Sequence, residues 1–156
     1  MFLKQRLADD LKAALKAGDR SRIECLRMLR ARVLEHEIAL RPERGRDQEP
    51  ADDEIVQVLA AYAKQRREAI EEFRKGRRED LAGREEAELA IVQSYLPRPL
   101  DAAEIRELVR SAIAELGATS PRELGAVMKR VLPVVSGRAD GKLVSQIVRE
   151  LLEPQA

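Results

Sequence analysis

The chain has 156 residues, of which 44% are hydrophobic but only 3% aromatic, so a folded core must consist mainly of aliphatic side chains. Its 29 lysines and arginines face 28 aspartates and glutamates. The resulting net charge of +1 excludes a basic coat, and any nucleic-acid binding must use a local patch. The single cysteine, Cys25, excludes an internal disulfide and any metal site built from several cysteines.

Apolar residues at helical spacing predict two helices at the start of the chain. In the first, leucines recur every four residues from Leu3 to Leu15, and Gly18 is placed to end it. Asp19 or Ser21 can cap the second helix. Its expected helical face comprises Ile23, Leu26, Leu29 or Arg30, Val33 and Leu34, and continues towards Ile38 and Leu40. The polar segment 41–50, flanked by prolines, is predicted to be a mobile loop.

A third helix is expected from Asp52, as its cap, to Gly76, and a fourth is expected to stop near Leu96 before the two prolines of "LPRP". The charged segment "KQRREAIEEFRKGRRED" joins these two helices. Its carboxylates alternate with arginines, which favours a solvated face with pairs four residues apart over an acid–base site.

Capping patterns predict the C-terminal helices. Asp101 and Glu104 form a capping-box pattern, in which side chains satisfy free backbone N–H groups, and Gly117 closes that helix. Ser120 and Glu123 repeat the pattern one helix later. A final helix is expected to follow the turn at residues 136–140.

The expected architecture is all-α, with about seven helices in two subdomains. An N-terminal helical domain is predicted over residues 1–96 and a three-helix C-terminal tail over residues 97–156, because the prolines at 97 and 99 interrupt the helical pattern. The N-terminus lacks the apolar block of a signal peptide, and no apolar run suits a membrane helix. A cytoplasmic location with no membrane partner is therefore predicted.

The turn "SGRADGK" has two interpretations that the residues leave open. Glycines can bring backbone N–H groups close to a phosphate, and a helix N-terminus follows. In this interpretation the candidate nucleic-acid-binding residues are Lys129, Arg130, Gly137, Arg138, Gly141 and Lys142.

The alternative is a structural turn between two helices. Pro133 would end the first helix, Gly137 would adopt a left-handed angle, Asp140 would cap the second helix and Gly141 would allow close helix packing. The two interpretations can coexist, with binding confined to the rim of the turn.

Catalytic, metal-binding and cofactor-binding residues are not predicted. His36 is the only histidine and is expected to be an ordinary residue on a helix surface or edge, while Cys25 is expected to be a buried filler. Neither a Walker loop nor a Rossmann fingerprint is present, so no nucleotide cofactor is expected.

The segment "GAVMKRVLPVVSGRADGKLVSQIVRELL" resembles the tail shared by YqeY-like proteins and the GatB subunit of tRNA-dependent amidotransferase. The segments "RMLRARVLEHEI" and "SYLPRPL" resemble the N-terminal part of stand-alone YqeY proteins. The resemblance covers nearly the whole chain and implies a helical N-terminal domain followed by a GatB/YqeY-type tail. Ala126 stands where the family often has lysine, which lowers the local positive charge.

The resemblance implies a non-catalytic module that binds tRNA or a tRNA-linked assembly, because the related tail of the amidotransferase touches the body of tRNA. One alternative is an adaptor whose charged N-terminal helices dock on amidotransferase or aminoacyl-tRNA synthetase components. Another is an accessory component of a glutamine-dependent amidotransferase, with carbon–nitrogen ligase activity only by similarity. The catalytic domain and the amidase subunit of that enzyme have no counterpart in this sequence.

Overall fold

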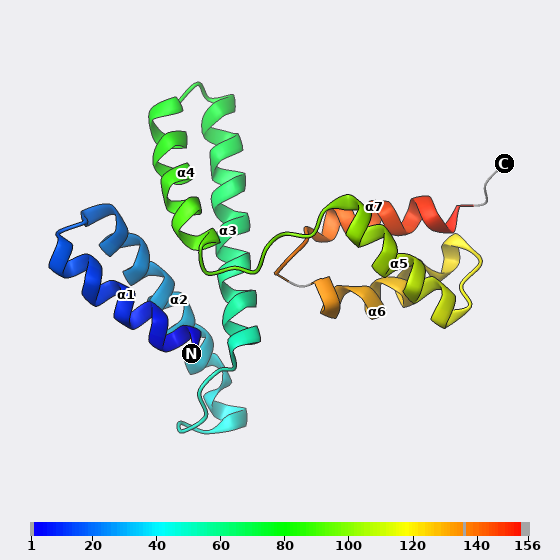
Figure 1. The fold of residues 1–156 in the computed structure, drawn as a ribbon, viewed down its shortest axis with the longest axis horizontal. Coiled ribbons are helices and arrows are strands. Elements are labelled where there is room, and N and C mark those ends of the chain that lie inside the picture. The colour runs from blue at the N-terminus through cyan, green and yellow to red at the C-terminus, as the bar shows by residue number, and fades with distance from the viewer. Residues whose placement is uncertain (1, 136, 154–156) are drawn as a thin grey trace. The chain divides into compact units, whose positions relative to one another are not determined.

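The computed structural model describes residues 2–135 and 137–153, and all regular secondary structure within them is helical, which confirms the predicted all-α class. A 3₁₀-helix, η1 (Pro121–Glu123), accompanies seven α-helices (Figure 1). These are α1 (Leu3–Ala17), α2 (Arg20–Arg44), α3 (Asp52–Lys75), α4 (Glu79–Gln93), α5 (Ala102–Leu116), α6 (Leu124–Val135) and α7 (Gly141–Leu152).

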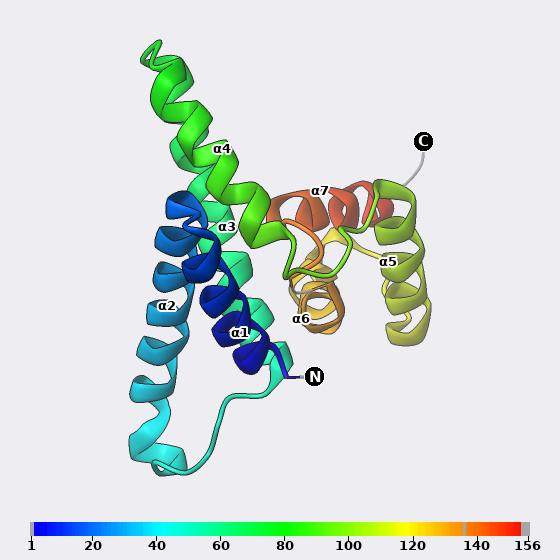
Figure 2. The same ribbon diagram turned by 60° about the vertical axis from the view of Figure 1, so that its left-hand side comes forward.

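The chain divides into an N-terminal unit, Met1–Pro97, and a C-terminal unit, Arg98–Ala156. The N-terminal unit packs α1 against α2 and α3 against α4, and α2 also contacts both α3 and α4 (Figure 2). Its buried core is aliphatic apart from two tyrosines and Cys25: Leu7, Leu11, Ala14, Cys25, Leu26, Leu29, Val33, Ile55, Leu59, Tyr62, Ala63, Val92 and Tyr95.

The leucine stripe expected on α1 is only partly buried. Leu7 and Leu11 enter the core, but Leu15 is exposed and Ala14 takes the next buried position. A repeat of exactly four residues drifts around a helix with 3.6 residues per turn, by about 40° at each step. The stripe from Leu3 to Leu15 therefore turns away from the core before the helix ends at Gly18, which has the predicted left-handed conformation.

The apolar face expected on α2 is wrong in its second half. Leu26 and Leu29 are fully buried, whereas Leu34 is 47% exposed and Ile38 is 48% exposed. Leu34 follows the buried Val33 by one residue, which rotates its side chain by about 100° around the helix. The core of the N-terminal unit therefore covers only one flank of α2.

The loop predicted over residues 41–50 begins later than expected, because α2 continues through Pro42 to Arg44. Proline lacks one backbone N–H, and near a helix end that loss removes a single intrahelical hydrogen bond. Gly45, with a φ of 83°, follows the helix, and its N–H donates to the carbonyl of Arg41.

Asp52 does not cap α3, whose N-cap residue is Ala51. Its carboxylate instead accepts a hydrogen bond of 2.9 Å from the backbone N–H of Leu3, the first residue of α1. A helix start leaves such N–H groups without an intrahelical partner. Asp52 therefore satisfies the start of a helix that lies far away in the sequence.

Charged pairs of α3 and α4 run both between the two helices and along α3, where Lys75 contacts Glu72 at 3.2 Å. Arg66 pairs with Glu85 at 3.0 Å, and Arg74 pairs with Glu86. The hydroxyl of the buried Tyr62 donates to Glu88 of α4. These contacts link the two helices along their length.

The C-terminal unit follows its predicted capping pattern. Both hydrogen bonds of the capping box between Asp101 and Glu104 are present, Gly117 is left-handed, and Ser120 and Glu123 form a second capping box before η1. The helices enclose a separate core of Ile105, Val109, Ala112, Ala118, Val127, Val131, Val135, Val144, Ile147, Val148 and Leu152.

Pro133 does not end the preceding helix, because α6 continues through it to Val135. Its missing N–H removes one hydrogen bond in the last turn, which the helix tolerates. The carbonyl of Val135 then accepts hydrogen bonds from the N–H groups of Arg138, at 2.9 Å, and Ala139, at 3.1 Å. The hydrogen bonds from the turn to Val135 therefore end α6, and Pro133 does not.

Candidate functional site

The turn between α6 and α7 has a defined backbone on both sides of residue 136, which lies outside the described residues. Gly137 has a φ of 77°, a left-handed value that side chains disfavour. Asp140 is the N-cap residue of α7, and its carboxylate accepts a hydrogen bond of 3.2 Å from the N–H of Lys142. A Cβ atom added at Gly141 would meet no neighbour within 4 Å, so close helix packing does not explain this glycine.

The N-terminus of α7 is therefore not an open anion cradle. A helix start attracts anions through its free N–H groups and partial positive charge. Here the negatively charged Asp140 carboxylate already lies against those groups. A phosphate bound at this helix end would have to displace the carboxylate or bind beside it.

Arg138 has a structural role in the C-terminal unit. Its Nε donates a hydrogen bond of 3.2 Å to the carbonyl of Arg98, and its own carbonyl accepts one of 2.8 Å from the N–H of Leu100. The turn is thereby fastened to the segment that leads into α5. Only part of the Arg138 guanidinium is used in this way.

The same segment carries an ion pair at the start of α5. Arg98 and Glu104 approach to 2.5 Å. The hydrogen bond from Arg98, that from the N–H of Asp101, and the nearby charge of Arg138 lower the pKa of the Glu104 carboxyl to about 2. Glu104 is therefore ionised at neutral pH and pairs with Arg98 beside the turn.

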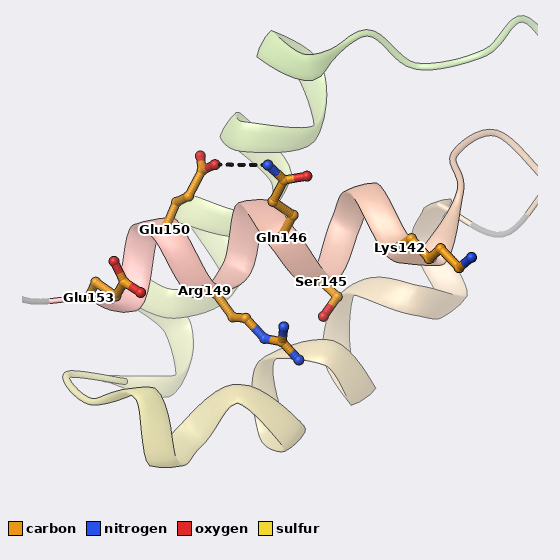
Figure 3. A pocket seen from close by; sticks show the side chains of 7 residues that line it. Lys142, Ser145, Gln146, Arg149, Glu150 and Glu153 are labelled. Carbon is orange, nitrogen blue, oxygen red and sulfur yellow. Dashed lines mark hydrogen bonds between the residues drawn. The ribbon is translucent and has the colours of Figure 1, made fainter.

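Lys142 lines an open hollow of about 570 Å³ on the surface of α7, shown in Figure 3. Its lining consists of Gly141, Lys142, Ser145, Gln146, Arg149, Glu150 and Glu153. In Figure 3, Gln146 and Glu150 point to one side of α7, and Ser145 and Arg149 to the other. Glu150 is engaged by Arg106 of α5 at 2.9 Å, which offsets part of the negative charge in the hollow.

Lys129 and Arg130 lie in a second hollow, of about 560 Å³, formed by residues of α5 and α6. Arg130 pairs with Glu115 of α5 at 2.5 Å, and both side chains are more than half exposed. Such exposed pairs contribute little stability, and Arg130 can exchange Glu115 for another anion.

The candidate binding residues thus lie at three separate places in the C-terminal unit and do not form a single phosphate-binding site. Lys129 and Arg130 line the hollow of α5 and α6, Lys142 lines that of α7, and Arg138 braces the turn. Arg149, which was not among the predicted binding residues, is exposed and follows Lys142 by seven residues. That spacing is two helical turns, so counting along the amphipathic α7 would have placed both cations on one face.

His36 and Cys25, the side chains most suited to catalysis, both lie in the N-terminal unit and not near the turn between α6 and α7. Glu54 contacts Arg44 at 2.6 Å and His36 Nε2 at 3.4 Å, and these two contacts lower the pKa of the Glu54 carboxyl.

The described residues contain no group of three potential metal ligands. Nor does any helix among them have the length and apolarity to cross a membrane.

Cys25 is buried, as predicted, and its thiol is expected to be unreactive in the folded protein. Burial, followed by the negative charge of Glu88, raises the pKa of this thiol to about 12, so the reactive thiolate is scarce at neutral pH. We expect a thiol reagent to modify Cys25 only at the rate at which the N-terminal unit opens. Rapid modification under native conditions, at a rate equal to that in denaturant, would contradict this expectation.

Comparison with known proteins finds one matching family and several similar proteins. A family model described as Yqey-like protein matches residues 4–152. Proteins named "Altered inheritance of mitochondria protein 41, mitochondrial" align with it in several fungi. The one from Pyrenophora tritici-repentis is 31% identical over 94% of this chain and 79% of the relative. That from Lachancea thermotolerans is 34% identical over 74% of this chain and 60% of the relative. That from Eremothecium gossypii is 32% identical over 83% of this chain and 68% of the relative.

The predicted cytoplasmic location is wrong on this comparison, because four relatives carry the word mitochondrial in their names. That prediction relied on the lack of a signal peptide and of a membrane helix, and these features do not distinguish one aqueous compartment from another. The match over residues 4–152, together with the two helical units, shows that the chain belongs to the Yqey-like protein family.

Proposed function

We propose that the C-terminal unit binds tRNA through one face of α7, without catalysing a reaction itself. This α7 basic face consists of Lys142, Ser145 and Arg149, which follow one another at three and four residues along the helix. The observation that carries the proposal is that Lys142 and Arg149 are both exposed and form no ion pair with any described residue. Cations without partners are available to phosphates, and a serine hydroxyl can donate to a phosphate oxygen.

The resemblance of residues 125–152 to a tRNA-contacting tail supports tRNA as the ligand. The charge distribution supports a weak and salt-sensitive complex, since Glu153 lies at the rim of the same hollow. Lys129 and Arg130 add a second point of contact on α6. Arg138 and Gly137 position the helix in this proposal, because the turn is fastened to the segment before α5.

The test is a binding titration of the full chain with a fluorescently labelled tRNA at several salt concentrations. Each phosphate contact adds about 0.7–0.9 to the slope of log affinity against log salt. We expect the double variant Lys142→Glu, Arg149→Glu to lose at least about tenfold in affinity and to reduce that slope by about 1.4–1.8. Circular dichroism should show unchanged helicity, because both side chains are exposed.

The matched control makes the same change in net charge at two exposed positions of the N-terminal unit, with Lys64→Glu and Arg84→Glu. This variant should keep its tRNA affinity within about twofold, since neither residue belongs to the proposed contact and exposed charges outside it are screened by salt. Equal losses in the two double variants would show that only net charge matters, and the absence of binding at low salt would remove the proposal.

A further inference from the structure

One flank of α2 presents a regular stripe that no other helix of the N-terminal unit covers. We call it the α2 outer stripe, and it consists of Arg27, Arg30, Leu34, Ile38 and Arg41. These positions follow one another by three or four residues, so they share one face of the helix over about 21 Å. Figure 2 shows α2 at the left-hand edge of the unit, with α1 and α3 on its other side.

The middle of the stripe is apolar and both ends are cationic. Leu34 and Ile38 are about half exposed, and Arg27, Arg30 and Arg41 are exposed. Within the described residues none of the three arginines forms an ion pair, although Arg32 and Arg44 of the same helix do. Two exposed aliphatic side chains between free arginines form a small apolar centre with a charged rim, which is typical of protein contact surfaces.

The charge of the stripe determines what can cover it. A second copy of this chain is unfavourable, because pairing the stripe with itself would bring arginines against arginines with no acidic residue between them. A phosphate backbone would match the arginines but would leave Leu34 and Ile38 without an apolar partner. A helix with aliphatic residues in its middle and aspartate or glutamate in its outer turns matches the whole stripe.

We propose that the α2 outer stripe docks an acidic amphipathic helix of a partner protein, with two aliphatic residues against Leu34 and Ile38 and carboxylates against the flanking arginines. This surface belongs to the N-terminal unit and does not depend on tRNA binding by α7. The contact extends over only about four helical turns, so the complex is expected to be transient and salt-dependent.

Photo-crosslinking in the native cells tests the location and the chemistry together. A benzophenone amino acid replaces Ile38 in one variant and Ala87, an exposed residue of α4, in the control. We expect the Ile38 variant, and not the Ala87 variant, to yield a crosslinked peptide in which aliphatic residues are flanked by acidic ones. The yield should survive RNase and fall when Arg27 and Arg30 are both changed to Glu.

The crosslinked segment is then made as a synthetic peptide and titrated with the purified full chain. Leu34→Ala with Ile38→Ala should weaken binding by about tenfold at all salt concentrations, because apolar burial is not screened. Arg27→Glu with Arg30→Glu should weaken it mainly at low salt. Crosslinks that go to RNA, that are equal at Ile38 and Ala87, or that reach a segment without acidic residues would overturn the proposal.

Discussion

We expect the Leu26→Ala variant to lose about 2–5 kcal/mol of unfolding free energy in the N-terminal unit. Leu26 is fully buried on the inner flank of α2, so its truncation removes apolar contacts and leaves a cavity in the core. The surrounding core is close-packed, so the neighbouring side chains relax only partly into the cavity. The loss is large compared with the roughly 5–15 kcal/mol of a typical domain.

The matched control is Leu34→Ala on the same helix. Leu34 is 47% exposed, so this variant should change stability by no more than about 0.5 kcal/mol. Chemical denaturation followed by tyrosine fluorescence reports on the N-terminal unit specifically, because the chain has no tryptophan and both of its tyrosines, Tyr62 and Tyr95, lie in that core. Equal destabilisation by the two variants would contradict the assignment of the inner and outer flanks of α2.

We expect the N-terminal unit to lose stability steeply above about pH 10, the ordinary pKa of a tyrosine in an unfolded chain. Burial, and then the hydrogen bond to Glu88, raises the pKa of Tyr62. Burial and the hydrogen bond to Asp10 raise the pKa of Tyr95 in the same way. The folded state therefore keeps both phenol protons at a pH where the unfolded state releases them.

The sign of the effect follows from proton binding. Each tyrosine stabilises the fold fully below its unfolded pKa, and that stability falls as the pH rises, by about 1.4 kcal/mol per pH unit for each group. The unfolding free energy from tyrosine fluorescence or far-ultraviolet circular dichroism, measured at a series of pH values, gives this slope. The variant Tyr62→Phe should have a shallower slope above pH 10, although it is less stable at neutral pH because Glu88 loses its donor.

The contribution of the tyrosines to the pH dependence can be separated from that of Cys25. The raised pKa of Cys25 acts in the same direction, so the variants should be compared in a Cys25→Ala background. An identical slope in the parent and in Tyr62→Phe would mean that the Tyr62 phenol is not held protonated by the fold. Ultraviolet absorbance at alkaline pH would then show ordinary ionisation of Tyr62.

The assignments for α2 connect stability to the proposed interaction. If the inner flank holds the core and the outer stripe binds a partner, Leu26→Ala should weaken both folding and binding. Leu34→Ala should weaken only binding. The two substitutions remove the same atoms from the same helix, so their comparison separates the two roles.

Local chemistry made the helices of the C-terminal unit predictable from the sequence by itself. The capping boxes of Asp101 with Glu104 and of Ser120 with Glu123 involve residues three positions apart, and such contacts form wherever the helix starts. The left-handed Gly18 and Gly117 are equally local. The helical class of the whole chain follows from the same period of apolar residues, because that period is a property of each helix alone.

Contacts between distant residues were decided only by the tertiary structure. Asp52 caps α1 and not its own helix, Arg138 fastens the turn to Arg98, and Leu34 lies on the outer flank of α2 although it continues an apolar pattern. The period of a helix tells which residues share a face, but it does not tell which neighbour covers that face. That choice depends on how the helices pack, and the packing leaves the α2 outer stripe and the α7 basic face uncovered by the other helices of their own units.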